Sequence, residues 1–233
     1  MNGGQIDMKH SKVKWILISI CLLVLLTSII VYIFRDAILF KAGCFMAPAG
    51  NYQADVAILE GTDFISTGMV MSGVNLLSLG KVKRLVIVLQ NIAQKDRPYG
   101  INGDYADLIR KKLEDHGLKE TDFKVLKVPI RHPITLNEAK VVLQGLSMEN
   151  VKSAVLVSAG FHTRRSYLVY QHEGFPLQIK IFPYAYFPTY DLSNWRIKSS
   201  GVRDFEVEVA KLFYYMIGGY IPFKLSYSET PAE

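Results

Sequence analysis

The sequence predicts an α/β domain with a mainly parallel sheet of about five strands, preceded by one transmembrane helix. Two observations carry this prediction. Short apolar runs alternate with amphipathic segments from residue 55 to residue 217, which is typical of a parallel sheet covered by helices on both faces. Before them, twenty uncharged residues run from Trp15 to Phe34. A helix of that length spans about 30 Å, the thickness of the hydrocarbon core of a bilayer.

The Trp15–Phe34 segment is predicted to be an uncleaved signal anchor. A cleaved signal peptide has a shorter apolar core, about 7–15 residues, and a small-residue exit, whereas this segment ends in the bulky Tyr32-Ile33-Phe34. Three lysines lie between residues 9 and 14, and positive charge is sparser after the segment. The positive-inside rule therefore places residues 1–14 in the cytoplasm and the following domain outside it, in a single-pass protein of the plasma (inner) membrane.

Residues 35–53 are predicted to form a short connector, residues 54–223 the α/β domain and residues 224–233 a tail. Strands are expected at five apolar runs, Asp55–Leu59, Arg84–Leu89, Phe123–Val128, Ser153–Ser158 and Leu177–Phe182. Helices are expected at Ser66–Leu79, Tyr105–His116, Leu136–Leu146, His162–Glu173 and Val202–Ile217. The aromatic stretch 183–200 is interpreted as an irregular lid on the core, or as a loop that lines a pocket or touches the lipid interface. The apolar stretch 212–223 is too short to span a membrane and is interpreted as the end of a packed core helix.

Composition narrows the class of partner. The chain has 233 residues, of which 50% are hydrophobic and 21% charged, and this excludes a disordered protein. Its formal net charge of +6 is spread along the chain rather than gathered in one tract, so no nucleic-acid-binding surface is expected. A mildly basic surface favours the lipid bilayer and an anionic ligand as partners.

Polar residues follow three of the predicted strands, and the carboxyl ends of parallel strands meet at one edge of a sheet. The segment that contains the fourth strand reads VLVSAGFHTRRS, in which a buried strand turns directly into a helix. His162 and Arg165 are three residues apart and share a face of that helix, so one can exchange protons while the other holds an anion. The predicted site comprises His162 as acid/base and, for the ligand, Arg165, Ser158, Thr135, Asn137, Glu138, Glu60, Gly61 and Asp63.

Simpler interpretations of the same residues stay open. Thr135 and Glu138 fit a capping box at the start of a helix, a role that needs no ligand. The arginines could be solvated, and His162 could be a turn residue. The sequence carries no metal-binding motif, no phosphate-cradling glycine loop and no Gly-x-Ser-x-Gly elbow. Ser158 is therefore a weak candidate nucleophile, no metal site is expected and no cofactor is identified.

The VLVSAGFHTRRS segment resembles the hallmark of the YdcF/SanA/ElyC family of bacterial domains, which is an apolar strand, a Thr/Ser turn and a His-x-x-Arg step. The run from Thr135 to Ala139, TLNEA, is similar to the family's Thr-x-Glu-Asn-Ala element, with Glu and Asn exchanged. DVAILEG resembles the family's first strand. In this chain, Trp195 resembles a residue of the family's aromatic loop, and Glu208, Ala210 and Tyr215 resemble residues of the family's last helix. The resemblance covers about Asp55 to Gly219.

The resemblance implies a three-layer Rossmann-like domain, an N-terminal membrane tether and a link to cell-envelope integrity, without a settled reaction. Family members end the second strand in Ser-Gly-Gly, where this chain has Leu89-Gln90-Asn91. Because glycines let a backbone approach a ligand closely, their absence favours binding of an anionic, phosphate-bearing or lipid-linked ligand without turnover. The alternatives are a transferase or hydrolase acting on such a ligand in envelope polymer biogenesis, with His162 as acid/base, and a non-catalytic structural envelope module.

The orientation of the membrane segment is the first testable prediction. A reporter fused after Glu233 should lie outside the cytoplasm, because the charge bias holds the N-terminus inside. Alkaline phosphatase, which is active only outside the cytoplasm, should be active in that fusion, and a reporter that works only in the cytoplasm should be silent. The reverse pattern would contradict the orientation.

Overall fold

The computed structural model describes residues 3–61, 66–91 and 105–222 of the chain. The chain divides into two units, residues 1–42 and residues 43–233. The first unit is part of one long helix, α1 (Gly3–Met46), whose last turn belongs to the second unit. The second unit is the α/β domain, and it begins at Gly43 rather than at the predicted Ala54.

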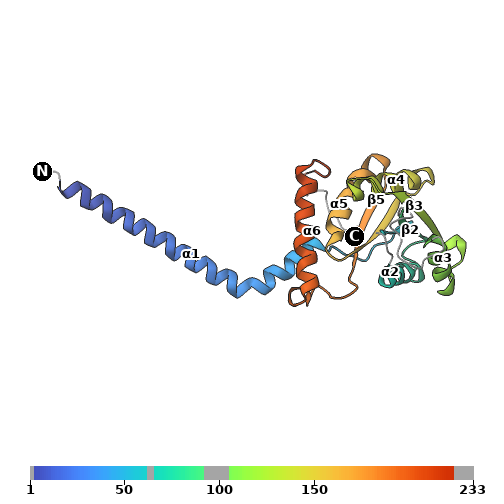
Figure 1. The fold of residues 1–233 in the computed structure, drawn as a ribbon, viewed down its shortest axis with the longest axis horizontal. Coiled ribbons are helices and arrows are strands. Elements are labelled where there is room, and N and C mark those ends of the chain that lie inside the picture. Colours follow the sequence, from blue (N-terminus) through green and yellow to red (C-terminus); the bar gives the residue numbers. More distant parts are fainter. Residues whose placement is uncertain (1–2, 62–65, 92–104, 223–233) are drawn as a thin grey trace. The chain divides into compact units, whose positions relative to one another are not determined.

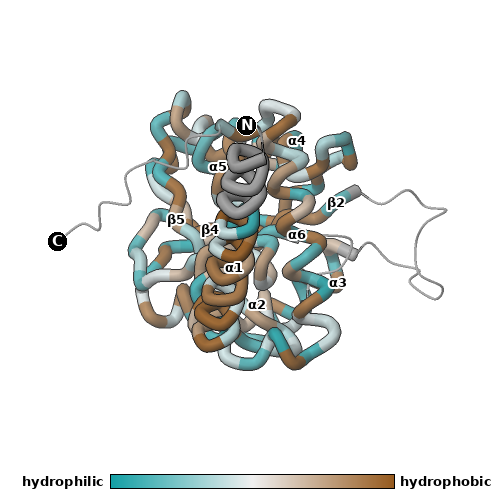
Figure 2. Tube along the Cα trace, turned by 90° about the vertical axis from the view of Figure 1, so that its left-hand side faces the viewer, coloured by the Kyte–Doolittle hydropathy of each residue, from teal (hydrophilic) through white to brown (hydrophobic). Residues whose placement is uncertain are grey.

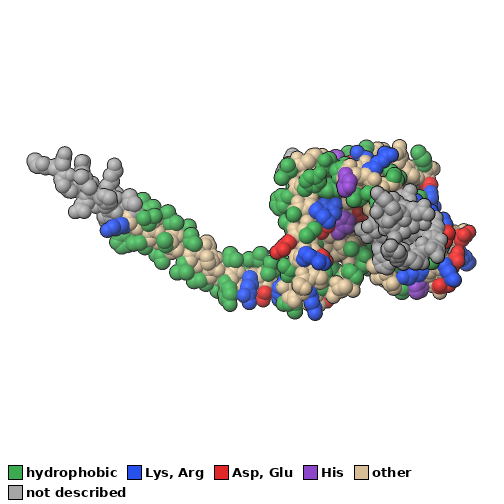
Figure 3. Space-filling view, in the orientation of Figure 1, with side chains coloured by type: hydrophobic (Ala, Val, Ile, Leu, Met, Phe, Trp, Pro, Cys, Tyr) green, Lys and Arg blue, Asp and Glu red, His purple; other side chains and the backbone are tan. Residues whose placement is uncertain are grey.

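Helix α1 is long and apolar enough to cross a membrane over Lys14–Met46, a stretch of 33 residues. The apolar side chains from Trp15 to Phe34 are exposed, and this part of the helix is mostly brown in Figure 2 and largely green in Figure 3. The hydroxyls of Thr27 and Ser28 donate to backbone carbonyl oxygens one turn back, at 2.9 and 2.8 Å, so neither hydroxyl needs water. A helix that is apolar on all sides without protein around it fits a membrane span.

The first part of the connector predicted at residues 35–53 is helical, because α1 continues to Met46. Residues 35–46 contain no proline and one glycine, so nothing in them breaks a helix. Pro48 and Gly50 follow, and the chain there is irregular up to β1.

Five parallel strands form the sheet at the centre of the domain (Figure 1). Their order across the sheet is β3-β2-β1-β4-β5. Their bounds are Val56–Leu59 for β1, Arg84–Asn91 for β2, Phe123–Pro129 for β3, Ser153–Ala159 for β4 and Lys180–Tyr186 for β5. Every neighbouring pair is parallel, with Val56 of β1 opposite Arg84 on one side and Ala154 on the other. The predicted parallel α/β fold is therefore confirmed.

Helices cover both faces of the sheet and give a three-layer, Rossmann-like arrangement (Figure 1). They are α2 (Thr67–Ser78), α3 (Tyr105–Asp115), α4 (Ile134–Met148), α5 (His162–Gly174) and α6 (Ser199–Ile217), with short 3-10 turns at Glu120–Asp122, Phe175–Leu177 and Trp195–Ile197. On one face, Leu59 of β1 lies in a single buried cluster with Val70 of α2 and Leu113 of α3. Helices α4 and α5 contact each other on the opposite face, and α6 packs against α5.

Strand β5 begins later than predicted and runs through Pro183 to Tyr186. Leu177, at which it was expected to begin, is the last residue of a 3-10 turn. A proline fits here because β5 is an edge strand, where a missing backbone N–H costs no hydrogen bond within the sheet. In the described part of the chain, an isolated antiparallel bridge joins Tyr184 of β5 to Ala49. The sequence-based assignment took Pro183 as the end of the strand and so placed the strand too early.

The end of α6 is less buried than the sequence predicts. Leu212 and Tyr215 are buried, whereas Phe213, Tyr214 and Ile217 are exposed. The helix ends at Ile217 and is followed by two glycines, the second with a φ of +70°. The interpretation of this stretch as the end of a packed helix holds for one face of α6, whereas the other face is apolar and exposed.

Val155 tests the assignment of β4 as a buried central strand. It lies opposite Ala57 of β1 and Phe182 of β5 and is 1% exposed. Val155→Asp places a carboxylate there without a cation, and we expect the free energy of unfolding to fall by several kcal/mol. Chemical unfolding of the full chain in detergent, followed by tryptophan fluorescence, measures the loss.

Val141→Asp is the matched control. Val141 of α4 is 44% exposed, so a carboxylate at this position keeps its water. We expect a change of less than about 0.5 kcal/mol. Equal losses of stability in the two variants would show that β4 is not buried as described.

Candidate functional site

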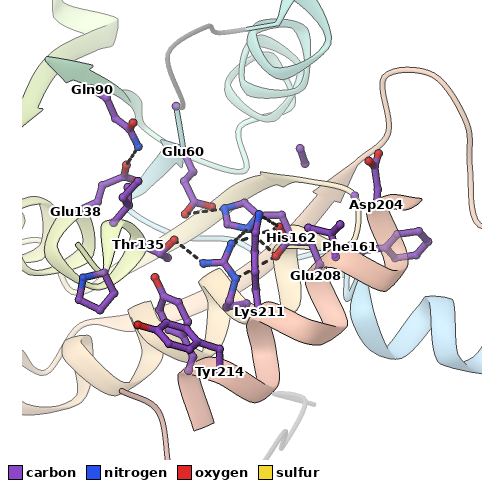
Figure 4. Close-up of a pocket in the computed structure, with 18 of the residues that line it drawn as sticks. Glu60, Gln90, Thr135, Glu138, Phe161, His162, Asp204, Glu208, Lys211 and Tyr214 are labelled. Atoms are coloured by element: carbon purple, nitrogen blue, oxygen red, sulfur yellow. Dashed lines mark hydrogen bonds and ion pairs between the residues drawn. The ribbon is translucent and has the colours of Figure 1, made fainter. Parts of the chain in front are cut away.

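A cavity of about 650 Å³ opens at the carboxyl edge of the sheet, where the strand order reverses between β1 and β4. Crevices at such a reversal are the usual ligand sites of open α/β sheets. The walls come from the ends of β1, β2 and β4, from the first turns of α4 and α5 and from one side of α6 (Figure 4). Segments far apart in the sequence thus meet around one space.

His162, the first residue of α5, lies between two carboxylates. Its Nε2 is 3.3 Å from Glu60 Oε1, and its Nδ1 is 3.3 Å from Glu208 Oε2. Burial lowers the pKa of the imidazole, but Glu60 and Glu208 outweigh both burial and the charge of Arg165 and raise this pKa to about 9. The side chain lines the cavity and is 21% exposed, so it can meet a ligand.

Glu60 follows β1 directly and joins it to α5. It is buried, and its carboxylate accepts hydrogen bonds from the hydroxyls of Ser158 and Ser166, the latter at 2.6 Å. Burial raises the pKa of Glu60, but the charge and hydrogen bond of His162, together with the two serines, bring it below its ordinary value. An ionised Glu60 therefore fixes the imidazole, and Ser158 supports Glu60 rather than acting as a nucleophile.

Arg165 is held by protein groups on several sides (Figure 4). Its Nε donates to Glu208 Oε2 at 3.0 Å, and its Nη1 donates to Thr135 Oγ1 at 2.7 Å. Its Cζ lies 4.9 Å from the centroid of the Tyr215 ring, and the residue is buried. This geometry favours a role in positioning Glu208 and His162 over the direct anion contact that the sequence predicted for Arg165.

Arg165 also constrains the imidazole proton. Nη2 of Arg165 is 2.7 Å from Nδ1 of His162, and Nε2 of His162 is 3.0 Å from Ser166 Oγ. These distances fit a neutral ring that carries its proton on Nε2 and accepts from Arg165 at Nδ1. The carboxylates of Glu60 and Glu208 favour a second proton on the imidazole of His162. That proton would be on Nδ1 and would point to Glu208. The two demands conflict, so protonation of His162 requires the guanidinium to move away from Nδ1.

Glu138, in α4, is a buried carboxyl held by neutral partners. It accepts a hydrogen bond from the hydroxyl of Tyr170 at 3.1 Å and a longer one from Gln90 Nε2 at 3.4 Å. Burial, followed by the negative charge of Glu60, raises the pKa of Glu138 to about 8. The carboxyl is thus protonated at neutral pH while Glu60 is ionised, so one cavity holds two acids in opposite protonation states.

The capping box predicted at the start of α4 is wrong. Helix α4 begins at Ile134, so Thr135 lies within its first turn rather than at the N-cap. The hydroxyl of Thr135 accepts a hydrogen bond from Arg165, and the carboxyl of Glu138 accepts one from Tyr170. Both side chains therefore bind residues of α5 instead of capping backbone N–H groups. These contacts form only in the folded chain, so the spacing of residues in the sequence does not show them.

The predicted site residues divide into three groups. Those that line the cavity are His162, Arg165, Thr135, Glu138, Glu60 and Gly61. Ser158 bonds to Glu60 behind the lining, and Asn137 donates to two backbone carbonyl oxygens at the start of α4 instead of lining the cavity. Asp63 lies outside the described residues.

Sequence analysis missed several lining residues, among them Glu208, Lys211, Gln90 and Asp204. Glu208 and Lys211 are one turn apart on α6, with Lys211 Nζ 2.9 Å from Glu208 Oε1. The sequence marks Glu208 only through the family resemblance, because nothing local shows that α6 meets α5. The sequence does contain one signal of a site here, because Glu208 and Lys211 are opposite charges three residues apart in an otherwise apolar stretch.

The first turns of α4 and α5 face the cavity without a side-chain cap. The residues before them, Pro133 and Phe161, make no capping hydrogen bond, whereas Ser66 caps α2 by accepting from the backbone N of Met69 at 3.2 Å. Uncapped first turns leave backbone N–H groups to be satisfied and carry the positive end of the helix dipole. The cavity wall therefore contains two helix ends that favour an anion.

Within residues 3–61, 66–91 and 105–222, no group of three or more His, Cys, Asp or Glu side chains is placed to hold a metal ion. No protein-family model, no curated protein and no solved structure matches the chain. The resemblance to the YdcF/SanA/ElyC family therefore rests on the motifs quoted above and stays a prediction.

Glu138 makes stability depend on pH. Its pKa is about 8 in the folded state against 4.5 for an ordinary Glu, so unfolding releases a proton between these values. The contribution of Glu138 to stability is therefore complete below pH 4.5 and is lost as the pH rises through 8. His162 acts in the same direction, between 6.5 and about 9. We expect the free energy of unfolding to fall between about pH 6 and about pH 8.5.

Glu138→Gln keeps a polar side chain but removes this proton. The fall in the free energy of unfolding should be smaller in this variant than in the unaltered chain, as measured by chemical unfolding in detergent at the two pH values. Glu149→Gln is the control, because Lys124 and Arg84 lower the pKa of Glu149 and it does not titrate in this window. An unchanged pH dependence in Glu138→Gln would show that Glu138 is already ionised.

Proposed function

We propose that this protein is a membrane-anchored cell-envelope protein that binds an anionic, phosphate-bearing or lipid-linked ligand at the carboxyl edge of its sheet. The two uncapped helix starts in the cavity wall carry this proposal. Backbone N–H groups and the helix dipole together bind phosphate and carboxylate groups without a further motif. They offer an anion site that does not depend on a glycine-rich loop.

The charged side chains of the cavity are compatible with an anion. Glu208 is paired with Arg165, and His162 lies 3.3 Å from both Glu208 and Glu60 and offsets their negative charge when it is protonated. Lys211 has a different position, since its ammonium contacts Glu208 while its side chain is 50% exposed on the cavity wall. An ammonium in this position can turn to a ligand and keep its water, so it is a better direct partner for an anion than the buried Arg165.

A transferase or hydrolase acting on such a ligand in envelope polymer biogenesis is the second candidate. The observation that favours it is the pair Glu60 and Glu138, whose pKa values are driven in opposite directions in one cavity. Such pairs supply an acid and a base at the same pH. Glu138 would protonate a leaving group, and His162, held by Glu60, would exchange a proton with water or an acceptor.

The free energy needed to bury the charged groups of this site argues against a purely structural envelope module. Glu60, Arg165 and Glu208 are all buried, and taking three charges out of water is expensive. Apolar side chains of similar volume would stabilise a domain as well or better. Perturbed pKa values gathered in a cleft are instead typical of functional sites.

The location is proposed from α1 and the charges around it. The helix is long and apolar enough to cross a membrane, and the lysines before it favour a cytoplasmic N-terminus. The domain and its cavity would then face the extracytoplasmic side of the plasma membrane. A ligand delivered on that side fits a role in the cell envelope.

Lys211→Gln tests the anion. Mass spectrometry of compounds extracted from the purified full chain identifies what the cavity holds. We expect an anionic compound with the unaltered chain and at least about tenfold less of it with Lys211→Gln, because a charge-assisted contact contributes about 1.5–3 kcal/mol. Lys83→Gln is the matched control, since Lys83 Nζ also lies 2.9 Å from a carboxylate, Asp55 Oδ1, but at the opposite edge of the sheet. The same compound at equal levels in both variants would rule out an anion held at Lys211.

His162→Gln separates binding from catalysis. It removes proton exchange but keeps a polar side chain beside Glu60. A binding protein should retain the same compound, because Lys211 and the helix starts remain. An enzyme should instead hold an unreacted substrate in place of the product. His172 is exposed and lies near the end of the same helix, so His172→Gln should change neither the amount nor the identity of the bound compound.

A further inference from the structure

An exposed apolar face runs along α6 and reaches the cavity. This α6 apolar face consists of Val207, Ala210, Phe213, Tyr214 and Ile217, all exposed. Their spacing of three and four residues places them on one side of the helix, opposite the side that packs on the domain. Val207 and Tyr214 also line the cavity, so the apolar face and the cavity form one continuous surface. Figure 3 shows apolar side chains gathered over one end of the region where α6 lies in Figure 1.

Lys211 lies at the border between the two parts of this surface. It comes four residues after Val207 and three before Tyr214, and Figure 4 shows it on the same side of α6 as Tyr214. Its ammonium lies 2.9 Å from Glu208 Oε1. A long side chain with an apolar stem and a charged head suits the boundary between a polar head group and an apolar chain.

The membrane anchor keeps this surface near lipid. Gly43, the first residue of the domain, follows Phe34 by nine residues. Gly43 is packed tightly, since a Cβ on it would lie 2.9 Å from Trp195 Nε1 and 3.6 Å from Phe161 Cε1. Phe161 in turn lines the cavity. Chain length alone therefore holds the cavity within roughly 35 Å of the end of the uncharged segment, whatever the orientation of the two units.

We propose that the cavity takes the anionic head group of a membrane lipid, whose apolar chain lies along the α6 apolar face. This assignment rests on the proposed anion binding and names the ligand class as a phosphate-bearing lipid. A soluble phosphate compound would leave the apolar face in water. A second copy of the chain would cover that face but would give no reason for its continuity with a cavity that favours an anion. Because Gly43 follows the apolar segment by only nine residues, membrane lipid is the partner that lies within reach of the cavity.

Photo-crosslinking of the full chain in nanodiscs tests this assignment. The discs are phosphatidylcholine with a trace of radiolabelled dioleoyl phosphatidic acid as the anionic lipid. Replacement of Ile217 by the photoreactive benzoylphenylalanine places the probe on the α6 apolar face. The same replacement of Met148, at the end of α4, is the matched control, because both residues are 78% exposed. We expect at least about tenfold more label at position 217, equivalent to about 1.4 kcal/mol.

Two further arms separate this inference from the proposed function. Lys211→Gln combined with the probe at position 217 should lower labelling at least about tenfold. Labelled dioleoylglycerol, which has the same chains without phosphate, should label weakly, and labelling equal to that by phosphatidic acid would overturn anion binding as well. Labelling at position 217 no higher than at position 148, or crosslinks between two copies of the chain, would overturn the lipid assignment alone, since the anion found by mass spectrometry would stand.

Discussion

The rest of the domain depends on the buried ion network formed by Glu60, His162, Arg165 and Glu208. Its members come from the end of β1, from α5 and from α6, and Arg165 extends the network to Thr135 of α4. Each group compensates the charge or satisfies the hydrogen bonds of another. Loss of one member would leave a buried charge without its partner, which is more costly than the absence of the whole network. The network therefore constrains all four segments at once.

The same network sets the protonation of the cavity. Because His162 keeps Glu60 ionised, the negative charge of Glu60 adds to burial in raising the pKa of Glu138. Arg165 and Glu208 compete for Nδ1 of His162, one as a donor and the other as an acceptor. An anion at the start of α5 would favour the doubly protonated ring and draw the guanidinium away from it. Binding of the proposed anion would therefore be coupled to the protonation of His162 through Arg165.

The sequence predicted what depends on local pattern and missed what depends on long-range contact. The apolar runs fixed the parallel sheet, and the convergence of strand ends brought Glu60, Glu138 and His162 to one cavity. Glu208 was missed because it lies 46 residues from His162, on a helix whose docking side has no local signature. Thr135 was given a capping role because its spacing to Glu138 fits one, and only the folded chain shows that Arg165 takes its hydroxyl.

Helix α6 shows why periodicity alone could not describe the molecule. Leu212 and Phe213 are adjacent and both apolar, yet one packs on the domain while the other is exposed. A helix with apolar residues on two sides has no single hydrophobic period, and the sequence-based interpretation took the stretch from residue 212 onward as the end of a packed core helix. A contiguous exposed apolar face is a liability in water and marks a contact surface. The face lies beside a cavity that favours an anion, and the domain begins nine residues after a segment long enough to span a bilayer, so the lipid proposed to cover the face would remove that liability.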